Sequence, residues 1–170
     1  MGLRLTEQQQ RLAMFDGFAC AAKRHEDAQT QGLRASYVAL AESLFWAGVI
    51  DEHLRRSLWY QELLEMHPDG EVLPGMRYAR NFATHQLVAV SEADLAEIGE
   101  VTPTIRISLK GMRWAPFEDL PEPGGRPHQH LPGQQAAYRE HLANQSTTLT
   151  FLRLKSWFAA ASEAALASVD

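Results

Sequence analysis

The sequence predicts an all-α protein, a four- to five-helix bundle with one β-hairpin inserted near residues 101–117. Apolar residues recur at steps of three and four over most of the chain, which is the period of an amphipathic helix. Only the stretch after residue 100 alternates apolar and polar residues, which is the period of a strand. With 170 residues, 45% hydrophobic and 22% charged, we expect residues 1–170 to form a single domain.

The first two predicted helices span residues 5–29 and 33 to about 66. The first lacks proline and is rich in residues that favour helices, and residues 30–32 end it. The second is apolar on almost every side in its middle, so it should pass through the centre of the fold and leave apolar surface for a homodimer. Cys20 lies in an apolar stretch of the first helix and is expected to be buried.

Prolines and glycines in residues 67–75 predict a link before a third helix, which is expected from about residue 76 to 90. After it, Ser91 and Asp94 have the spacing of a capping box and predict a short fourth helix.

The hairpin prediction rests on the alternation over residues 104–109, followed by a turn at Lys110 and Gly111. Residues 118–133 are rich in proline and glycine and predict a surface loop, so residues 101–133 form one insertion of hairpin and loop. A last helix is expected from about residue 134 to 168.

Composition excludes several classes of protein. The formal net charge is −5, so any nucleic-acid binding needs a local basic patch rather than a basic surface. One cysteine excludes a disulfide framework and a zinc site with several cysteines, and it fits a reducing compartment. No run of about 18 apolar residues occurs. We therefore expect a soluble, cytoplasmic protein with no membrane span, bound metal or cofactor.

The third predicted helix carries the residues best suited to chemistry. Asn81 and His85 are four residues apart and share a helix face, and Arg80 reaches the same place with its long side chain. Arg77, four residues before Asn81, lies on this side too and is a candidate substrate-binding residue. A histidine can transfer the proton of a ribose 2′-hydroxyl, and an arginine can bind the phosphate.

The sequence Arg-Asn-x-x-x-His at residues 80–85, on a helix of a helical bundle, resembles the signature of the HEPN superfamily (higher eukaryotes and prokaryotes nucleotide-binding domains). In a chain of this length and composition, the expected number of chance occurrences of Arg-Asn followed by a histidine at that spacing is about 0.006. The resemblance implies a metal-independent endoribonuclease, found among toxins and phage-defence proteins, with an active site between two protomers. It also implies that Arg80 and His85 are catalytic, that Asn81 supports them, and that RNA and an antitoxin or other protein are partners.

Other readings of the same residues remain open. Arg80 and Asn81 are also suited to bracing the start of the helix, with His85 as a hydrogen-bonded histidine at a helix interface. The protein would then be a non-catalytic module that binds RNA, a nucleotide or a protein. Glu42 lies among apolar residues and needs a partner, for which Arg77 or Arg80 is the candidate. That pair is either a structural salt bridge or a support for catalysis.

The remaining candidates lie on the second helix and in the insertion. Asp51 and Glu52 either orient an arginine across the bundle, ligate a metal with Glu42, or mark a solvated stripe. Arg106 and Lys110 are candidates to follow a nucleic-acid backbone. Two further alternatives concern the same region: Trp114 either stacks on a base or covers the core, and the pair His128 and His130 either binds a metal or is plain loop.

Overall fold

The computed structural model describes residues 5–85, 90–94, 110–120 and 131–167, and it confirms the all-α class. At residues 82–85, 90–94, 110 and 131 it describes the backbone alone. The described part holds six α-helices, two short 3-10 helices and one antiparallel strand pair. In chain order they are α1 (Glu7–Ala28), α2 (Leu33–Leu54), α3 (Leu58–Met66), η1 (Pro68–Glu71), α4 (Val72–His85), β1 (Val90–Asp94), β2 (Lys110–Trp114), η2 (Phe117–Asp119), α5 (Leu131–His141) and α6 (Thr147–Ala167).

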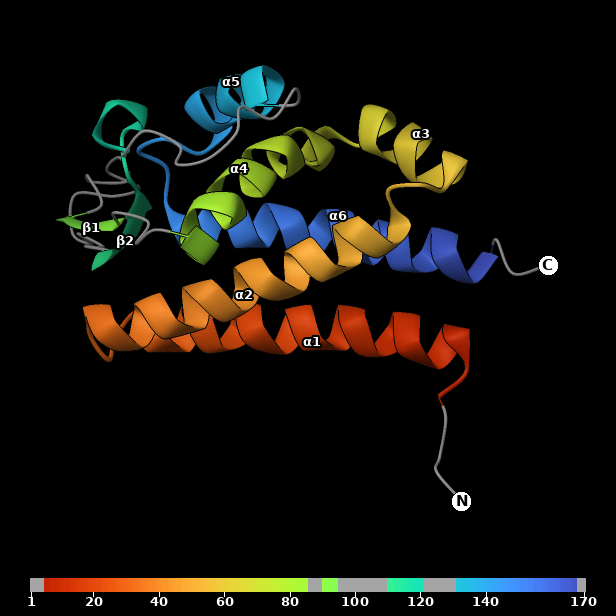
Figure 1. The fold of residues 1–170 in the computed structure, drawn as a ribbon. Coiled ribbons are helices and arrows are strands. Elements are labelled where there is room, and N and C mark those ends of the chain that lie inside the picture. Colours follow the sequence, from red (N-terminus) through yellow and green to blue (C-terminus); the bar gives the residue numbers. More distant parts are fainter. Residues whose placement is uncertain (1–4, 86–89, 95–109, 121–130, 168–170) are drawn as a thin grey trace, which may run out of the picture.

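Four long helices, α1, α2, α4 and α6, build the body of the molecule, with the strand pair at one end (Figure 1). α1 packs against α2 and α6, and α4 packs against α2, α5 and α6. Their buried faces meet in one apolar core, in which Phe18 of α1 contacts the edges of Phe151 and Phe158 of α6. Aromatic residues supply half of the largest fully buried side chains of the described residues.

α1 begins and ends where the sequence predicts. Thr6 Oγ1 accepts a hydrogen bond from the Gln9 amide at 3.2 Å, and Gln9 Oε1 accepts one from the Thr6 amide at 2.8 Å, which is a capping box. Gly32 has φ of +102° before α2, a conformation that glycine adopts without strain. The prediction that Cys20 is buried is wrong. Cys20 is exposed, because the apolar stretch around it continues past the buried face of the helix.

The predicted second helix is two helices, so its continuity to residue 66 is wrong. α2 ends at Leu54, Ser57 is extended, and α3 starts at Leu58. The turn brings Tyr60 back against α2, where its hydroxyl donates to Asp51 Oδ1 at 3.2 Å. No proline or glycine marks this break, which is instead accompanied by the tertiary contact between Tyr60 and Asp51.

The region around residues 67–94 differs from its prediction at both ends. α4 begins at Val72, because proline and glycine are tolerated in the first turn of a helix, where the amides have no helical partner. Ser91 and Asp94 do not start a helix. They lie in β1, which pairs with β2 in the register Val90 to Trp114 through Asp94 to Lys110.

The hairpin prediction is corrected in position. Lys110 and Gly111 lie in β2 and do not form a turn, because both pair with β1. The alternating stretch 104–109 lies outside the described residues, as does most of the expected loop over 118–133. The strands at this end of the bundle therefore come from residues 90–94 and 110–114 rather than from residues 101–117 alone.

The predicted last helix is also two helices. α5 ends at His141 and α6 starts at Thr147, with Asn144 at φ of +63° between them. The intervening backbone pairs with β2, since the Trp114 amide donates to Gln145 O at 3.0 Å and the Asn144 amide donates to Trp114 O at 3.1 Å. This pairing consumes the groups that a continuous helix would use.

Trp114 itself covers the core. Its side chain is fully buried, and Nε1 donates to Thr150 Oγ1 at 2.9 Å. Of the two alternatives for this residue, the described structure supports core packing.

Among the described residues, α2 is long and apolar enough to count as a candidate membrane span. However, 44% of that segment is buried within the fold, and a core helix meets the same length and composition criteria.

Candidate functional site

The candidate site lies where α4 crosses α2. α4 fits closely between its neighbours because Gly75 faces α5: a Cβ at this position would lie 2.8 Å from Leu142 Cδ1 and 3.1 Å from the Ala137 carbonyl. The other side of α4 faces α2 along a narrow seam with an apolar lining and two arginines, Arg77 and Arg80. The helix continues to His85, so the whole predicted motif lies on one helix.

Arg77 anchors this crossing by binding a buried carboxylate. Its Nε donates to Asp51 Oδ2 at 2.8 Å and its Nη2 to Asp51 Oδ1 at 2.6 Å, a bidentate pair whose carboxylate side chain is 5% exposed. Tyr60 donates to the same carboxylate, and burial, followed by the Asp51 charge, raises the pKa of Tyr60 above its ordinary value. The Arg77 guanidinium is therefore bound to the protein and holds α4 against α2.

Arg80 lies one turn further along α4 and nearer to solvent. Its side chain is 32% exposed, and Nη1 and Nη2 both lie 3.5 Å from Glu52 Oε2, whose own side chain is 57% exposed. Its stem lies over Gly48 of α2, where an added Cβ would be 2.4 Å from Arg80 Cδ. A long, solvent-exposed ion pair of this kind contributes little to stability. A phosphate can therefore compete with Glu52 for the Arg80 guanidinium.

Asn81 is exposed, and the helical backbone places His85 one turn after it on the same face. The His85 side chain lies outside the described residues, as do Arg106, the side chain of Lys110, and the pair His128 and His130. Arg80 and Asn81 are thus consecutive residues of α4, with Arg80 lying against α2 and Asn81 exposed, whereas Arg77 is bound to Asp51.

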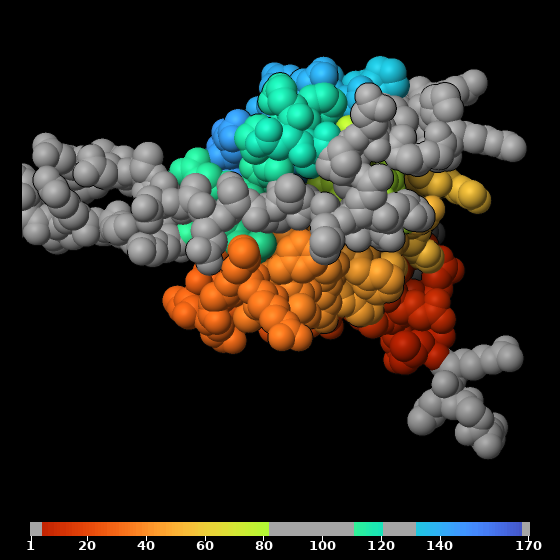
Figure 2. Space-filling model, turned by 60° about the vertical axis from the view of Figure 1, so that its left-hand side comes forward, coloured from red at the N-terminus to blue at the C-terminus, as the bar shows by residue number. Residues whose placement is uncertain are grey.

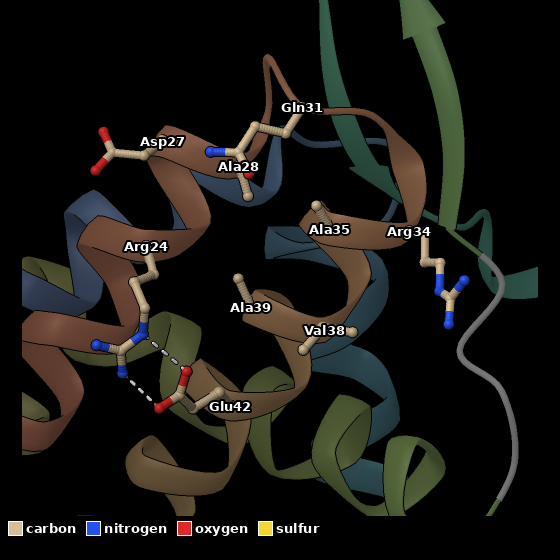
Figure 3. A pocket seen from close by; sticks show the side chains of 9 residues that line it. All are labelled: Arg24, Asp27, Ala28, Gln31, Arg34, Ala35, Val38, Ala39 and Glu42. Carbon is tan, nitrogen blue, oxygen red and sulfur yellow. Dashed lines mark hydrogen bonds and ion pairs between the residues drawn. The ribbon is translucent and has the colours of Figure 1, made fainter.

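Glu42 is not the partner of Arg77 or Arg80, so that expectation is wrong. It pairs with Arg24 of α1, with Arg24 Nε 3.0 Å from Glu42 Oε2 and a second bond between Nη2 and Oε1 (Figure 3). The reason is the position of Glu42 on α2: it faces α1, one side of the helix away from α4. This pair lines an open groove of about 740 Å³ between α1 and α2, with Ala35 and Ala39 among its apolar lining.

The sequence left the roles of two residues of the site open. Asp51 is buried and orients Arg77 across the bundle, whereas Glu52 is exposed, as a solvated stripe predicts, and lies 3.5 Å from Arg80. The available signal was a carboxylate within an apolar helix, which needs a cationic partner when buried. Gly48 gave no signal, because a glycine within an apolar helix has many explanations.

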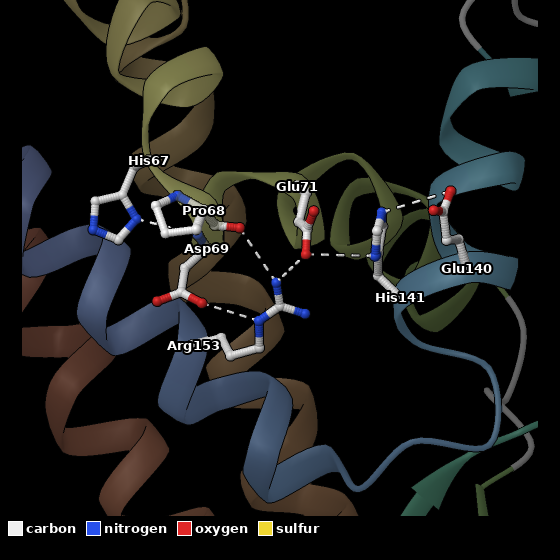
Figure 4. Close-up of polar contacts among 7 residues, drawn as sticks. All are labelled: His67, Pro68, Asp69, Glu71, Glu140, His141 and Arg153. Carbon is white, nitrogen blue, oxygen red and sulfur yellow. Dashed lines mark hydrogen bonds and ion pairs between the residues drawn. The ribbon is translucent and has the colours of Figure 1, made fainter.

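A second polar cluster joins α6 to η1 and α5 (Figure 4). Arg153 Nε donates to Asp69 Oδ1 at 3.0 Å, and Nη2 donates to Pro68 O at 3.3 Å and to Glu71. His141 approaches Glu71 and Glu140, with 3.8 Å between nitrogen and oxygen in each case. Arg153 faces the carboxylates of Asp69 and Glu71, so we interpret the cluster as a structural clamp. No set of three or more His, Cys, Asp or Glu side chains in the described ranges is arranged to hold a metal ion.

Comparison of the chain with family models, with curated proteins and with solved structures finds no match.

Proposed function

We propose that this protein is a metal-independent endoribonuclease of the type that it resembles, with Arg80, Asn81 and His85 in its active site. The observation that best supports the proposal is the contrast between the two arginines of α4. Arg77 is bound to the buried carboxylate of Asp51, whereas Arg80, three residues later, lies beside the exposed carboxylate of Glu52 and directly precedes exposed Asn81 in the chain. The two arginine side chains are similarly exposed, 25% and 32%, so the contrast lies in their partners. Arg77 makes a short bidentate bond to a buried carboxylate, whereas Arg80 lies 3.5 Å from an exposed carboxylate that a phosphate can replace more easily.

In the proposed reaction the ribose 2′-oxygen attacks phosphorus and the bond to the 5′-oxygen breaks. The products are a 2′,3′-cyclic phosphate and a 5′-hydroxyl. His85 takes the proton of the 2′-hydroxyl and returns a proton to the 5′-oxygen, a role that suits histidine because its ordinary pKa lies near neutrality. Arg80 binds the phosphate oxygens and stabilises the charge that develops on them, and Asn81 orients the substrate with its amide. Arg77 contributes by holding α4, not by contacting RNA.

The proposal includes a homodimer. Val38 and Phe45 on the outer side of α2 are 64% and 59% exposed, and Glu52, which contacts the Arg80 guanidinium of α4, lies further along α2. α2 forms much of the orange surface in Figure 2. An exposed apolar stripe next to the site is a suitable contact for a second copy, which would bring two Arg80 sites towards each other. We propose a cytoplasmic location and, as a further partner, an antitoxin or other regulatory protein.

A non-catalytic binding module is the second candidate. The groove between α1 and α2 supports it, because an open groove bordered by Arg24, Arg34 and Asp27 offers a ligand both charged and apolar contacts (Figure 3). Under this alternative the protein binds RNA, a nucleotide or a protein and cleaves nothing.

The test is cleavage of a mixed RNA pool by purified protein in EDTA, with detection of 2′,3′-cyclic phosphate ends. We expect cleavage by the parent protein and a loss of at least about 100-fold in His85→Ala and in Arg80→Ala, since each removes a group acting in the transition state. His53→Ala is the matched control, because His53 is exposed on α2 and has no proposed role. RNA that is bound but left intact by folded parent protein would contradict the nuclease and favour the binding module.

A further inference from the structure

Gly48 occupies an unusual position for a glycine, because it is buried in the interior of α2. Glycine is a poor helix former, and alanine at an interior position normally stabilises a helix. The geometry around Gly48 supplies a packing reason for a glycine at this position.

The space beside Gly48 is filled by one side chain. A Cβ at this position would lie 2.4 Å from Arg80 Cδ, 2.8 Å from Arg80 Nη1 and 2.9 Å from Arg80 Nε. These are the three nearest atoms, and all of them belong to Arg80. The missing methyl group therefore makes room for the stem and guanidinium of Arg80.

Two neighbouring contacts complete the arrangement. Asp51, three residues after Gly48, binds Arg77 and sets the position of α4 on α2. Glu52, one turn after Gly48, lies 3.5 Å from both terminal nitrogens of Arg80. Arg80 is thus held along its length, with its stem against Gly48 and its charged end beside Glu52.

We infer that Gly48 is a positioning residue for Arg80: it lets the guanidinium lie against α2, where its direction is set before RNA binds. The structural part of this inference needs only the contact, and its effect on cleavage rests on the proposed function. A free arginine side chain loses considerable rotamer entropy when it is ordered, so an arginine already packed on α2 binds a phosphate with less of that loss. Alanine at position 48 would displace the Arg80 side chain from the surface of α2.

A double-mutant cycle in thermal unfolding tests the contact without any assumption about function. In the Arg80→Ala background the space is empty, so we expect Gly48→Ala to raise Tm by roughly 2–4 °C through helix propensity alone. In the parent background we expect a smaller rise or a fall, because the new methyl group displaces Arg80. Equal Tm shifts in the two backgrounds would overturn the inference.

Gly17→Ala provides the matched control. Gly17 also lies within a helix, and a Cβ there would meet the Trp46 ring at 2.7 Å, so its substitution has a steric cost unrelated to Arg80. Its Tm shift should be the same with and without Arg80. A coupling as large as that of Gly48 would show that Arg80→Ala perturbs the whole bundle, and would overturn the assignment of the contact to Gly48.

The parent protein, Gly48→Ala, Arg80→Ala and the double variant then test positioning in the RNA cleavage assay. We expect Gly48→Ala to lower kcat/KM at least 10-fold without lowering Tm by more than a few degrees, and to have no further effect in Arg80→Ala. Unchanged kcat/KM in a Gly48→Ala protein whose Tm shows the coupling would refute the positioning role. If the parent protein cleaves no RNA, the proposed function fails, and the Tm cycle still decides whether Gly48 holds Arg80.

Discussion

Protonation of His25 should destabilise the fold as the pH falls. The His25 ring is fully buried where α1, α2 and α6 meet, and its edge contacts Phe151. Nδ1 lies 3.2 Å from Ser36 O, and because a carbonyl can only accept, Nδ1 carries the proton of the neutral ring. Nε2 lies 2.8 Å from Thr147 Oγ1 and 3.0 Å from the Gln29 amide nitrogen.

The neutral ring is therefore the form that this site accommodates. Burial lowers the pKa of His25 to about 4, against the opposing effect of its bond to Ser36. The ordinary value of 6.5 applies to the unfolded chain, so on acidification the unfolded state takes up the proton first. Stability from this residue is thus complete above pH 6.5, falls between pH 6.5 and 4, and is constant below that.

The magnitude follows from the difference between the two pKa values. Each pKa step is worth 1.36 kcal/mol, which gives a total loss of about 3.4 kcal/mol well below pH 4. Between pH 7.5 and pH 5.0, the same relation gives a loss of about 2 kcal/mol in the free energy of unfolding. For a domain of this size, that corresponds to a fall in Tm of roughly 4–8 °C.

Urea unfolding of the parent protein and of His25→Gln at pH 7.5 and 5.0 measures this effect. Glutamine keeps a polar group in reach of Thr147 and does not titrate, so its stability should change with pH by about 2 kcal/mol less than that of the parent. His53→Gln, which removes an exposed histidine from α2, is the control and should keep the parent's pH dependence. The same pH dependence in His25→Gln and in the parent would refute the reasoning.

Two other substitutions test the crossing of α2 and α4 and the proposed dimer. Asp51→Asn should lower the free energy of unfolding by about 3 kcal/mol, since it leaves the Arg77 charge and the Tyr60 hydroxyl without their carboxylate. Glu52→Gln, at an exposed pair on the next residue, should change it by less than about 0.5 kcal/mol in the same urea titration, and equal losses would show that Asp51 is no anchor. Phe45→Ser should convert the proposed dimer to a monomer in size-exclusion chromatography with light scattering, whereas Leu149→Ser, at an exposed position on α6, should not. A parent protein that is already monomeric at tens of micromolar would contradict the α2 interface.

Several features of the fold could be predicted because their causes are local. The helical period defines the class, and residues 30–32 mark the end of α1, whereas the capping box of Thr6 and Gln9 at its start is visible only in the structure. The motif on α4 could also be placed on a helix, since its residues follow a clear link. Each of these signals acts within about four residues along the chain, which is why the sequence alone contains it.

Other boundaries depend on partners that are distant in the sequence. α2 ends at Leu54 without a proline or glycine, and the turn that follows carries Tyr60 back to Asp51. Residues 90–94 contain a helix-capping pattern and yet form a strand, because residues 110–114 pair with them. The expected last helix is interrupted at Asn144, where the backbone bonds to β2.

The sequence by itself determined that this protein is helical and that α4 carries arginines, an asparagine and a histidine at helical spacing. Only the tertiary structure decided which arginine serves the fold. Arg77 and Arg80 are three residues apart and indistinguishable in local pattern, but α2 presents a buried carboxylate to the first, and a glycine with an exposed carboxylate to the second. Burying a charge requires a partner, and exposing one does not, so the packing of two helices separates an anchor from a candidate site.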